Sequence, residues 1–104
     1  MNYLNIQTIP NQSFSVTLDG NRFDISIVET AGVMSVSISI NDVVIIENVR
    51  ATAGTFLLPY LYEENGNLLF LNTGEDLIYY TNFSSTQQLV YFSTDDLNYL
   101  RGTN

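Results

Sequence analysis

The chain of 104 residues contains no cysteine, histidine or tryptophan, and its three basic residues are all arginines. Without cysteine there are no disulfide bonds, no thiolate nucleophile and none of the usual zinc sites. Without histidine the commonest general base is missing, and without lysine a Schiff base cannot form. Carboxylates, hydroxyls and tyrosines remain for chemistry, so we expect no enzymatic activity and no cofactor.

Positive charge and long hydrophobic runs are also scarce. Eleven acidic residues face the three arginines, which gives a net charge of −8. Nucleic acid and anionic membrane surfaces repel such a chain, so we expect neither as a partner. The longest apolar run, Val43 to Ile46, is far shorter than the ~20 residues that cross a bilayer. The N-terminus also lacks the pattern of a signal peptide. The acidic residues either keep the protein soluble or face a basic partner, and net charge alone does not distinguish these.

The length predicts a single β-domain over residues 1–104, because a chain of this size builds one small core and not two. Its hydrophobic content of 45% is typical of a globular protein. With no disulfide bond to hold it, such a domain depends on its core or on contacts with neighbouring proteins.

Alternation of apolar and polar residues with period two dominates the first half of the chain. Phe14 to Leu18 and Phe23 to Ile27 both alternate, and Asp19-Gly20 between them predicts a hairpin turn. Met34 to Ile40 is apolar at every second position, and serines fill the positions between. This pattern is typical of strands with one face on a core and one in water.

The remaining elements are predicted from shorter patterns. A first strand is expected over Tyr3 to Ile9. Val43 to Glu47 has lost its alternation, which predicts a strand covered on both sides. Pro59 makes Phe56 to Tyr62 an edge strand or an ordered loop, because proline cannot donate to a strand ladder. Strands are also expected over Leu68 to Asn72 and Gln88 to Ser93.

After the last strand, Thr94-Asp95-Asp96-Leu97 predicts a helix start, with Thr94 as the cap and two aspartates near the positive end of the helix dipole. Seven or so short strands at this spacing predict an all-β fold. We expect a small antiparallel β-sandwich or barrel of about seven strands with a short C-terminal helical turn.

Acidic residues are the main candidates for binding a ligand or a metal ion. The pairs Glu63-Glu64, Glu75-Asp76 and Asp95-Asp96 supply carboxylates, but neighbouring strand residues point to opposite faces, which does not suit a glycosidase. Glu63 to Asn67 groups several oxygen ligands and is either a weak calcium site or a solvated turn. A ligand-binding β-module for carbohydrate or calcium therefore stays open as an alternative function.

Tyrosine is the most prominent candidate for contact with a partner, because its large apolar ring and polar tip suit protein interfaces. Alternation fails from Tyr60 to Phe83, and tyrosines recur there. The predicted partner-binding residues are Tyr60, Tyr62, Leu77, Tyr79, Tyr80 and Phe83. The serine face of Ser35, Ser37 and Ser39 either accepts an added strand or a close-packed copy, or faces solvent.

Several motifs, taken in order, resemble those of the phage baseplate plug family, short virion proteins of contractile-tailed bacteriophages. They are the stretch Pro10 to Phe23 with its Leu-Asp-Gly hairpin, then Gly66 to Phe70, Leu89 to Tyr91 and Asp95 to Leu97. The resemblance spans roughly Ile6 to Leu97. It implies a non-enzymatic structural component of the tail baseplate, located in the virion and assembled in the host cytoplasm. It also implies hub or tube proteins as partners and an oligomer in a ring-like assembly.

Overall fold

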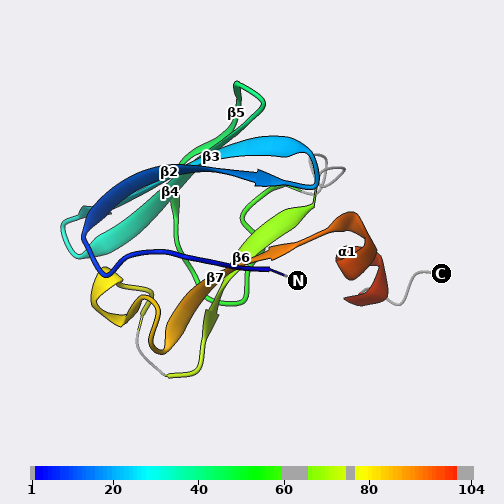
Figure 1. Cartoon of the computed structure of the whole chain (residues 1–104). Helices are drawn as coiled ribbons and strands as arrows, with labels where there is room; N and C mark the ends of the chain where they lie inside the picture. Colours follow the sequence, from blue (N-terminus) through cyan, green and yellow to red (C-terminus); the bar gives the residue numbers. More distant parts are fainter. Residues whose placement is uncertain (1, 60–65, 75–76, 101–104) are drawn as a thin grey trace.

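Three short hairpins build the larger sheet of the computed structural model, which describes residues 2–59, 66–74 and 77–100. Its strand order is β2-β3-β4-β5, and every neighbouring pair is antiparallel (Figure 1). The strands are β2 (Asn11–Leu18), β3 (Asn21–Thr30), β4 (Val33–Ile40) and β5 (Val43–Arg50). The alternating runs therefore form the strands that their period predicts.

All three connections are two-residue turns with positive φ at both residues. They are Asp19-Gly20 (51° and 81°), Ala31-Gly32 (52° and 83°) and Asn41-Asp42 (50° and 70°). Positive φ at both central residues defines the type I′ turn, whose twist matches that of the strands it joins. The hairpin predicted at Asp19-Gly20 is confirmed.

The smaller sheet has the order β1-β7-β6 and is also antiparallel. Its strands are β1 (Asn2–Leu4), β6 (Asn67–Asn72) and β7 (Gln87–Phe92), and the short helices η2 (Tyr80–Asn82) and α1 (Thr94–Leu100) flank β7. The two sheets form the small all-β sandwich that the sequence predicts, with one short helix near the C-terminus (Figure 1).

The main core lies between the two sheets. Phe23 from β3 meets Tyr91 from β7 edge to face, with ring centroids 5.6 Å apart, and Phe70 stacks on Phe83 at 5.9 Å. A second cluster lies on the other side of the smaller sheet, where Leu69, Val90, Phe92 and Leu97 pack together. Burial of each such side chain contributes about 1.5–3 kcal/mol, so the smaller sheet is stabilised from both of its faces.

The prediction that Val43 to Glu47 is covered on both sides is wrong. Val43 and Val44 are 59% and 62% exposed, and Ile46 is the only buried residue of β5. The pairing with β4 shifts register twice, so β5 carries two bulges that twist it away from the sheet. Figure 1 shows β5 projecting beyond its neighbours at the edge of the sheet.

The first strand is shorter than the predicted range of Tyr3 to Ile9. It ends at Leu4, because the chain then leaves the smaller sheet to reach the start of β2. Ile6 is buried, its carbonyl accepts a hydrogen bond from Ser84 Oγ at 2.6 Å, and Thr8 Oγ1 donates to the Phe83 carbonyl at 3.1 Å. These contacts hold residues 6–8 as a crossing between the sheets.

Helix α1 begins where the sequence predicts, but its cap lies one residue earlier than Thr94. Ser93 Oγ accepts a hydrogen bond from the Asp96 amide at 3.2 Å, and Asp96 Oδ2 accepts one from the Ser93 amide at 3.1 Å. This reciprocal pair is a capping box with aspartate in the usual place of glutamate. The described part of the chain holds no helix with the length and hydropathy to cross a bilayer.

Candidate interaction site

The 77–83 segment contains four of the six residues predicted to bind a partner. Leu77 is 74% exposed, Tyr79 and Tyr80 are half-buried, and Phe83 is 1% exposed. Leu77 therefore presents the most surface, while the ring of Phe83 belongs to the core. The other two predicted residues, Tyr60 and Tyr62, lie outside the described residues, and their role stays a prediction.

A buried glutamine fixes the start of the 77–83 segment. The side chain of Gln87 is fully buried; its Nε2 donates to the Leu77 carbonyl at 2.8 Å, and its Oε1 accepts from the Tyr79 amide at 2.9 Å. The hydroxyl of Tyr79 donates to Glu29 Oε2 at 3.2 Å. Removal from water, together with the nearby Glu29 carboxylate, raises the pKa of Tyr79. The segment is thus tied to both sheets.

Leu77 borders a small groove against the β3–β4 turn and the end of β5. The groove has a volume of about 120 Å³ and is lined by Gly32, Val33, Met34, Arg50, Ala51, Thr52, Ala53, Leu77 and Ile78. Sites for small organic ligands usually hold ~300–1,000 Å³. This groove therefore suits one apolar side chain of a protein partner.

Hydroxyl groups line the outer face of the larger sheet. A shallow groove of about 300 Å³ runs over this serine face, between Ser13, Phe14, Ser15, Asp24, Ile25, Ser26, Ser37 and Ser39. Neighbouring strands are linked across it: Ser13 Oγ donates to Ser26 Oγ at 3.0 Å, and Ser37 Oγ accepts from the Asn48 amide at 2.9 Å. The serine face is shallow and polar, and several of its hydroxyls hydrogen-bond to groups on the neighbouring strand.

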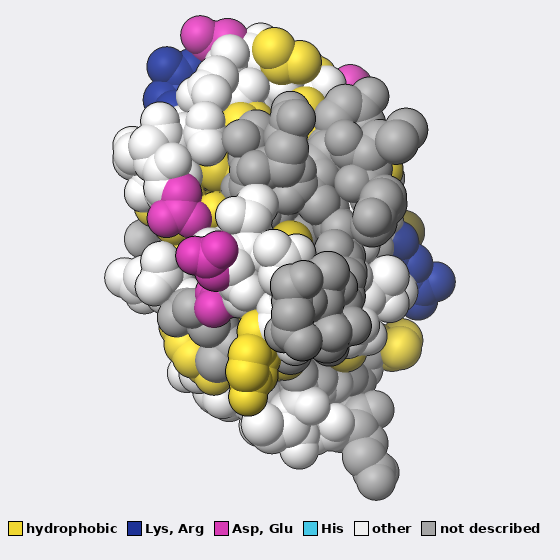
Figure 2. Space-filling view, turned by 90° about the vertical axis from the view of Figure 1, so that its right-hand side faces the viewer, with side chains coloured by type: hydrophobic (Ala, Val, Ile, Leu, Met, Phe, Trp, Pro, Cys, Tyr) yellow, Lys and Arg dark blue, Asp and Glu magenta, His cyan; other side chains and the backbone are white. Residues whose placement is uncertain are grey.

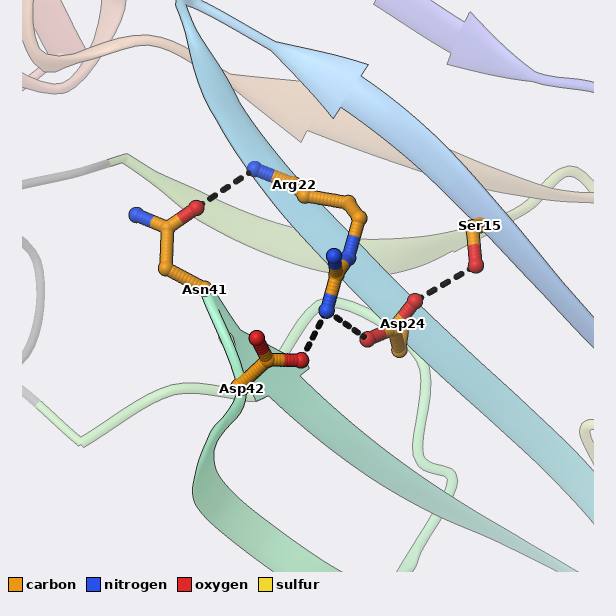
Figure 3. Close-up of polar contacts among 5 residues, drawn as sticks. All are labelled: Ser15, Arg22, Asp24, Asn41 and Asp42. Atoms are coloured by element: carbon orange, nitrogen blue, oxygen red, sulfur yellow. Dashed lines mark hydrogen bonds and ion pairs between the residues drawn. The ribbon is translucent and has the colours of Figure 1, made fainter.

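An arginine with two acidic partners marks one end of this face. Figure 3 shows the Arg22 side chain from β3 lying between Asp24, two residues along the same strand, and Asp42 in the β4–β5 turn. Arg22 Nη2 is 3.3 Å from Asp24 Oδ2 and also donates to Asp42. The Asn41 side chain accepts from the Arg22 amide at 2.9 Å. These contacts join two turns that lie about 20 residues apart in the sequence.

The opposite charges in this cluster stabilise the ionised forms of one another. Asp24 and Asp42 raise the pKa of Arg22 above its ordinary value. The Ser15 hydroxyl, which donates to Asp24, and the Arg22 guanidinium lower the pKa of Asp24. The groups are solvent-exposed, so their attraction adds little to stability, and it fixes the orientation of the turns instead.

Acidic side chains on the described surface are spread out rather than clustered. Across residues 2–59, 66–74 and 77–100, no three acidic side chains gather in a way that would hold a metal ion. Figure 2, which views the side near the C-terminal helix, shows acidic groups and scattered apolar groups, with basic groups at the margins. Of the Glu63 to Asn67 loop, left open as a calcium site, the residues Glu63 to Asn65 lie outside the described residues.

Sequence reasoning missed the two buried amides that hold the loops. Besides Gln87, the fully buried Asn67 accepts from the Leu58 amide at 2.8 Å and donates to the Leu58 carbonyl at 2.9 Å. Each is a polar residue at the start of a strand, which reads in sequence as an ordinary turn boundary. The Gly66-Asn67 pair is the sequence feature that could have indicated such a buried amide. The backbone N–H and C=O groups of a buried loop need hydrogen-bond partners, and an asparagine side chain can supply both kinds.

Comparison with known proteins gives one family. The family model described as cyanophage baseplate Pam3 plug gp18 matches residues 1–95. The match covers all seven described strands and the start of α1, and it confirms the resemblance found in the motifs. No curated protein matches the chain.

Proposed function

Because the chain belongs to the family of the cyanophage baseplate plug, we propose that it binds hub or tube proteins in a ring-like assembly of the tail baseplate. The family match carries this proposal: it makes the chain a structural baseplate protein. Its role is mechanical and non-enzymatic, and it is incorporated into the virion after synthesis in the host cytoplasm.

The described surface supports such a role. Leu77 offers an apolar side chain beside a groove too small for most small-molecule ligands, and the serine face is broad and shallow. Flat surfaces with a few exposed apolar anchors suit contact between proteins. Among the described residues no three acidic side chains gather as a calcium-binding module, the alternative function, would need.

Co-expression with the products of adjacent tail genes tests the proposal. We expect the chain to co-purify with a hub or tube protein, and light scattering after size-exclusion chromatography to give several copies per complex, as the rotational symmetry of tails requires. A chain that stays monomeric and binds none of these proteins contradicts the proposal. Calorimetry with calcium and a glycan panel serves as the control, and no heat of binding is expected.

A further inference from the structure

The sandwich has four sheet edges, and three of them are closed or blunted. Strand β1 is only three residues long, and the two bulges of β5 twist its edge out of register. The edge of β6 is covered by the chain before it, where Gly54 donates to the Phe70 carbonyl at 2.9 Å and Leu57 donates to the Leu68 carbonyl at 2.8 Å. These are the devices by which proteins keep strand edges from pairing with other chains.

Strand β2 is the exception. It runs for eight residues in unbroken register with β3, and it carries no proline, lysine or bulge to blunt its free edge. Its length equals that of the inner strand β4. Nothing in its backbone therefore opposes pairing with a further strand.

The phase of the β2–β3 ladder determines which backbone groups face outward. The pair that flanks a two-residue turn, here Leu18 and Asn21, is hydrogen-bonded, and bonded pairs recur at every second residue. The bond from the Glu29 amide to the Pro10 carbonyl, 3.0 Å, fits this phase. Four residues therefore direct their N–H and C=O groups away from β3, and the described chain supplies no backbone partner for them: Asn11, Ser13, Ser15 and Thr17.

The core beneath this edge is also incompletely covered. Phe14 and Val16 lie on the core side of β2 and pack against the core, yet both are only partly buried, whereas Leu18 is 5% exposed. Beside them lies a cleft of about 200 Å³, which is lined by Asn5, Gln7, Ile9, Gln12, Ser13 and Phe14. An added strand would cover Phe14 and Val16 with its own inward side chains.

We propose that the free edge of β2 binds an extended segment of a partner baseplate protein, which adds a fifth strand to the larger sheet. The segment carries apolar side chains at alternate positions, over Phe14 and Val16, and neutral or basic side chains beside Ser15 and Asp24. A second copy of this chain is disfavoured because it brings another net charge of −8 to the contact. The nature of the partner rests on the proposed function, and the open edge does not.

A proline at position 15 tests the added strand. The Ser15 amide points away from β3, so Ser15→Pro leaves the β2–β3 ladder intact while it removes an outward donor and places a ring in the path of the partner. Ser15→Ala is the matched control, because both variants lose the hydroxyl that donates to Asp24. With the hub or tube protein that co-purifies with the wild-type chain, we expect Ser15→Ala to keep its affinity and Ser15→Pro to lose about tenfold or more.

Amide hydrogen exchange of the wild-type chain gives a second measurement that does not depend on a variant. In the free protein we expect the amides of Ser13, Ser15 and Thr17 to exchange fast, and those of the alternate residues to be protected by their bonds to β3. In the complex we expect the three outward amides to exchange about tenfold more slowly or better. A partner that bound only through side chains would not produce this alternation.

The outcomes separate the inference from the proposed function. If Ser15→Pro and Ser15→Ala bind with equal affinity, or if the partner protects only amides of other strands, the inference of an added strand is wrong. Either result leaves the proposed baseplate role intact. Outward amides that become protected in the chain alone as its concentration rises assign the edge to a second copy, which overturns the partner segment. Failure of the wild-type chain to bind any hub or tube protein contradicts the proposed function and, with it, this choice of partner.

Discussion

Gly66 precedes β6 at a point where the backbone passes directly against β7. Its φ is +93°, and a Cβ there would lie 2.5 Å from both the Phe92 carbonyl oxygen and the Tyr91 hydroxyl. The first feature favours glycine by conformation, and the second excludes any side chain by contact. Gly66 opens one of the motifs that resemble the baseplate plug family, and its place in the structure explains why glycine is needed there.

We expect Gly66→Ala to lower the free energy of unfolding by about 3 kcal/mol, from left-handed strain together with the displaced carbonyl. Gly54→Ala is the matched control: Gly54 also has positive φ, at +73°, but a Cβ there meets nothing within 4 Å. It should cost only about 1 kcal/mol. Urea unfolding of both variants measures the difference, and equal losses would show that the contact at Gly66 is unimportant.

Ionisation of Tyr91 is expected to lower the free energy of unfolding at alkaline pH. Burial, and next the hydrogen bond of 2.8 Å that its hydroxyl donates to Asp19, raise its pKa above the ordinary value. The folded state therefore holds this proton more tightly than the unfolded state, and the stabilisation is lost as the pH rises past the unfolded value of about 10.

Tyr91→Phe should therefore flatten the loss of stability above about pH 10. At neutral pH the variant gives up the hydrogen bond to Asp19, about 1 kcal/mol, while it keeps the ring that packs on Phe23. Denaturant unfolding at neutral and alkaline pH checks both effects. Tyr79, whose pKa is also raised, acts equally in both proteins, so an unchanged slope would mean that Tyr91 is not the group that titrates.

Among the elements, the β3–β4 hairpin contains a turn whose first central residue, Ala31, does not match its geometry. Ala31 has a φ of 52°, although type I′ turns favour asparagine, aspartate or glycine at this position. Alanine is strained there because its Cβ crowds the carbonyl in the left-handed region. The hairpin forms nevertheless, because the whole of β4 pairs in register with β3, from Thr30–Val33 at the turn to Phe23–Ile40.

Ala31→Asn should raise the free energy of unfolding by about 0.5–1 kcal/mol, because Asn-Gly is the preferred type I′ pair. Ala31→Val is the opposite control, since a β-branched side chain suits positive φ least, and it should destabilise. Thermal unfolding of the two variants and the wild-type chain tests whether stability falls from asparagine through alanine to valine. A loss of stability with asparagine would mean that the turn is held by contacts other than its own backbone preference.

The 77–83 segment shows how one element depends on residues far along the chain. Gln87 in β7 binds the backbone of Leu77 and Tyr79, and the Tyr79 hydroxyl reaches Glu29 at the end of β3. A segment without strand or helix periodicity is thereby fixed by three side-chain hydrogen bonds. Its exposed Leu77 is accordingly held on an ordered support.

For the whole molecule, exposed apolar side chains are the available anchors for a baseplate partner. Leu77→Ser should leave thermal unfolding unchanged, because the side chain is 74% exposed, and should weaken binding of the co-purified hub or tube protein about tenfold. Tyr99→Ser on α1 is the matched control, since Tyr99 is 86% exposed and lies outside the predicted residues. Wild-type affinity of Leu77→Ser would exclude Leu77 as an anchor.

Much of this architecture follows from the sequence alone. The alternation of Phe14 to Leu18, Phe23 to Ile27 and Met34 to Ile40 predicted three of the strands and the all-β class. Side-chain alternation is a local property of the extended backbone. The aspartates after Ser93 predicted the helix start for the same local reason. The order of the motifs along the chain by itself indicated the baseplate plug family.

Only the tertiary structure decided which strands are covered. Val43 and Val44 are as apolar as core residues, yet bulges and an edge position expose them; Phe83 lies among the predicted contact residues, yet it is buried against Phe70. The β6 edge is closed by residues 53–58 and the β2 edge is open, although neither strand's own sequence says so. Coverage depends on contacts between segments far apart in the chain, and a local pattern does not encode them.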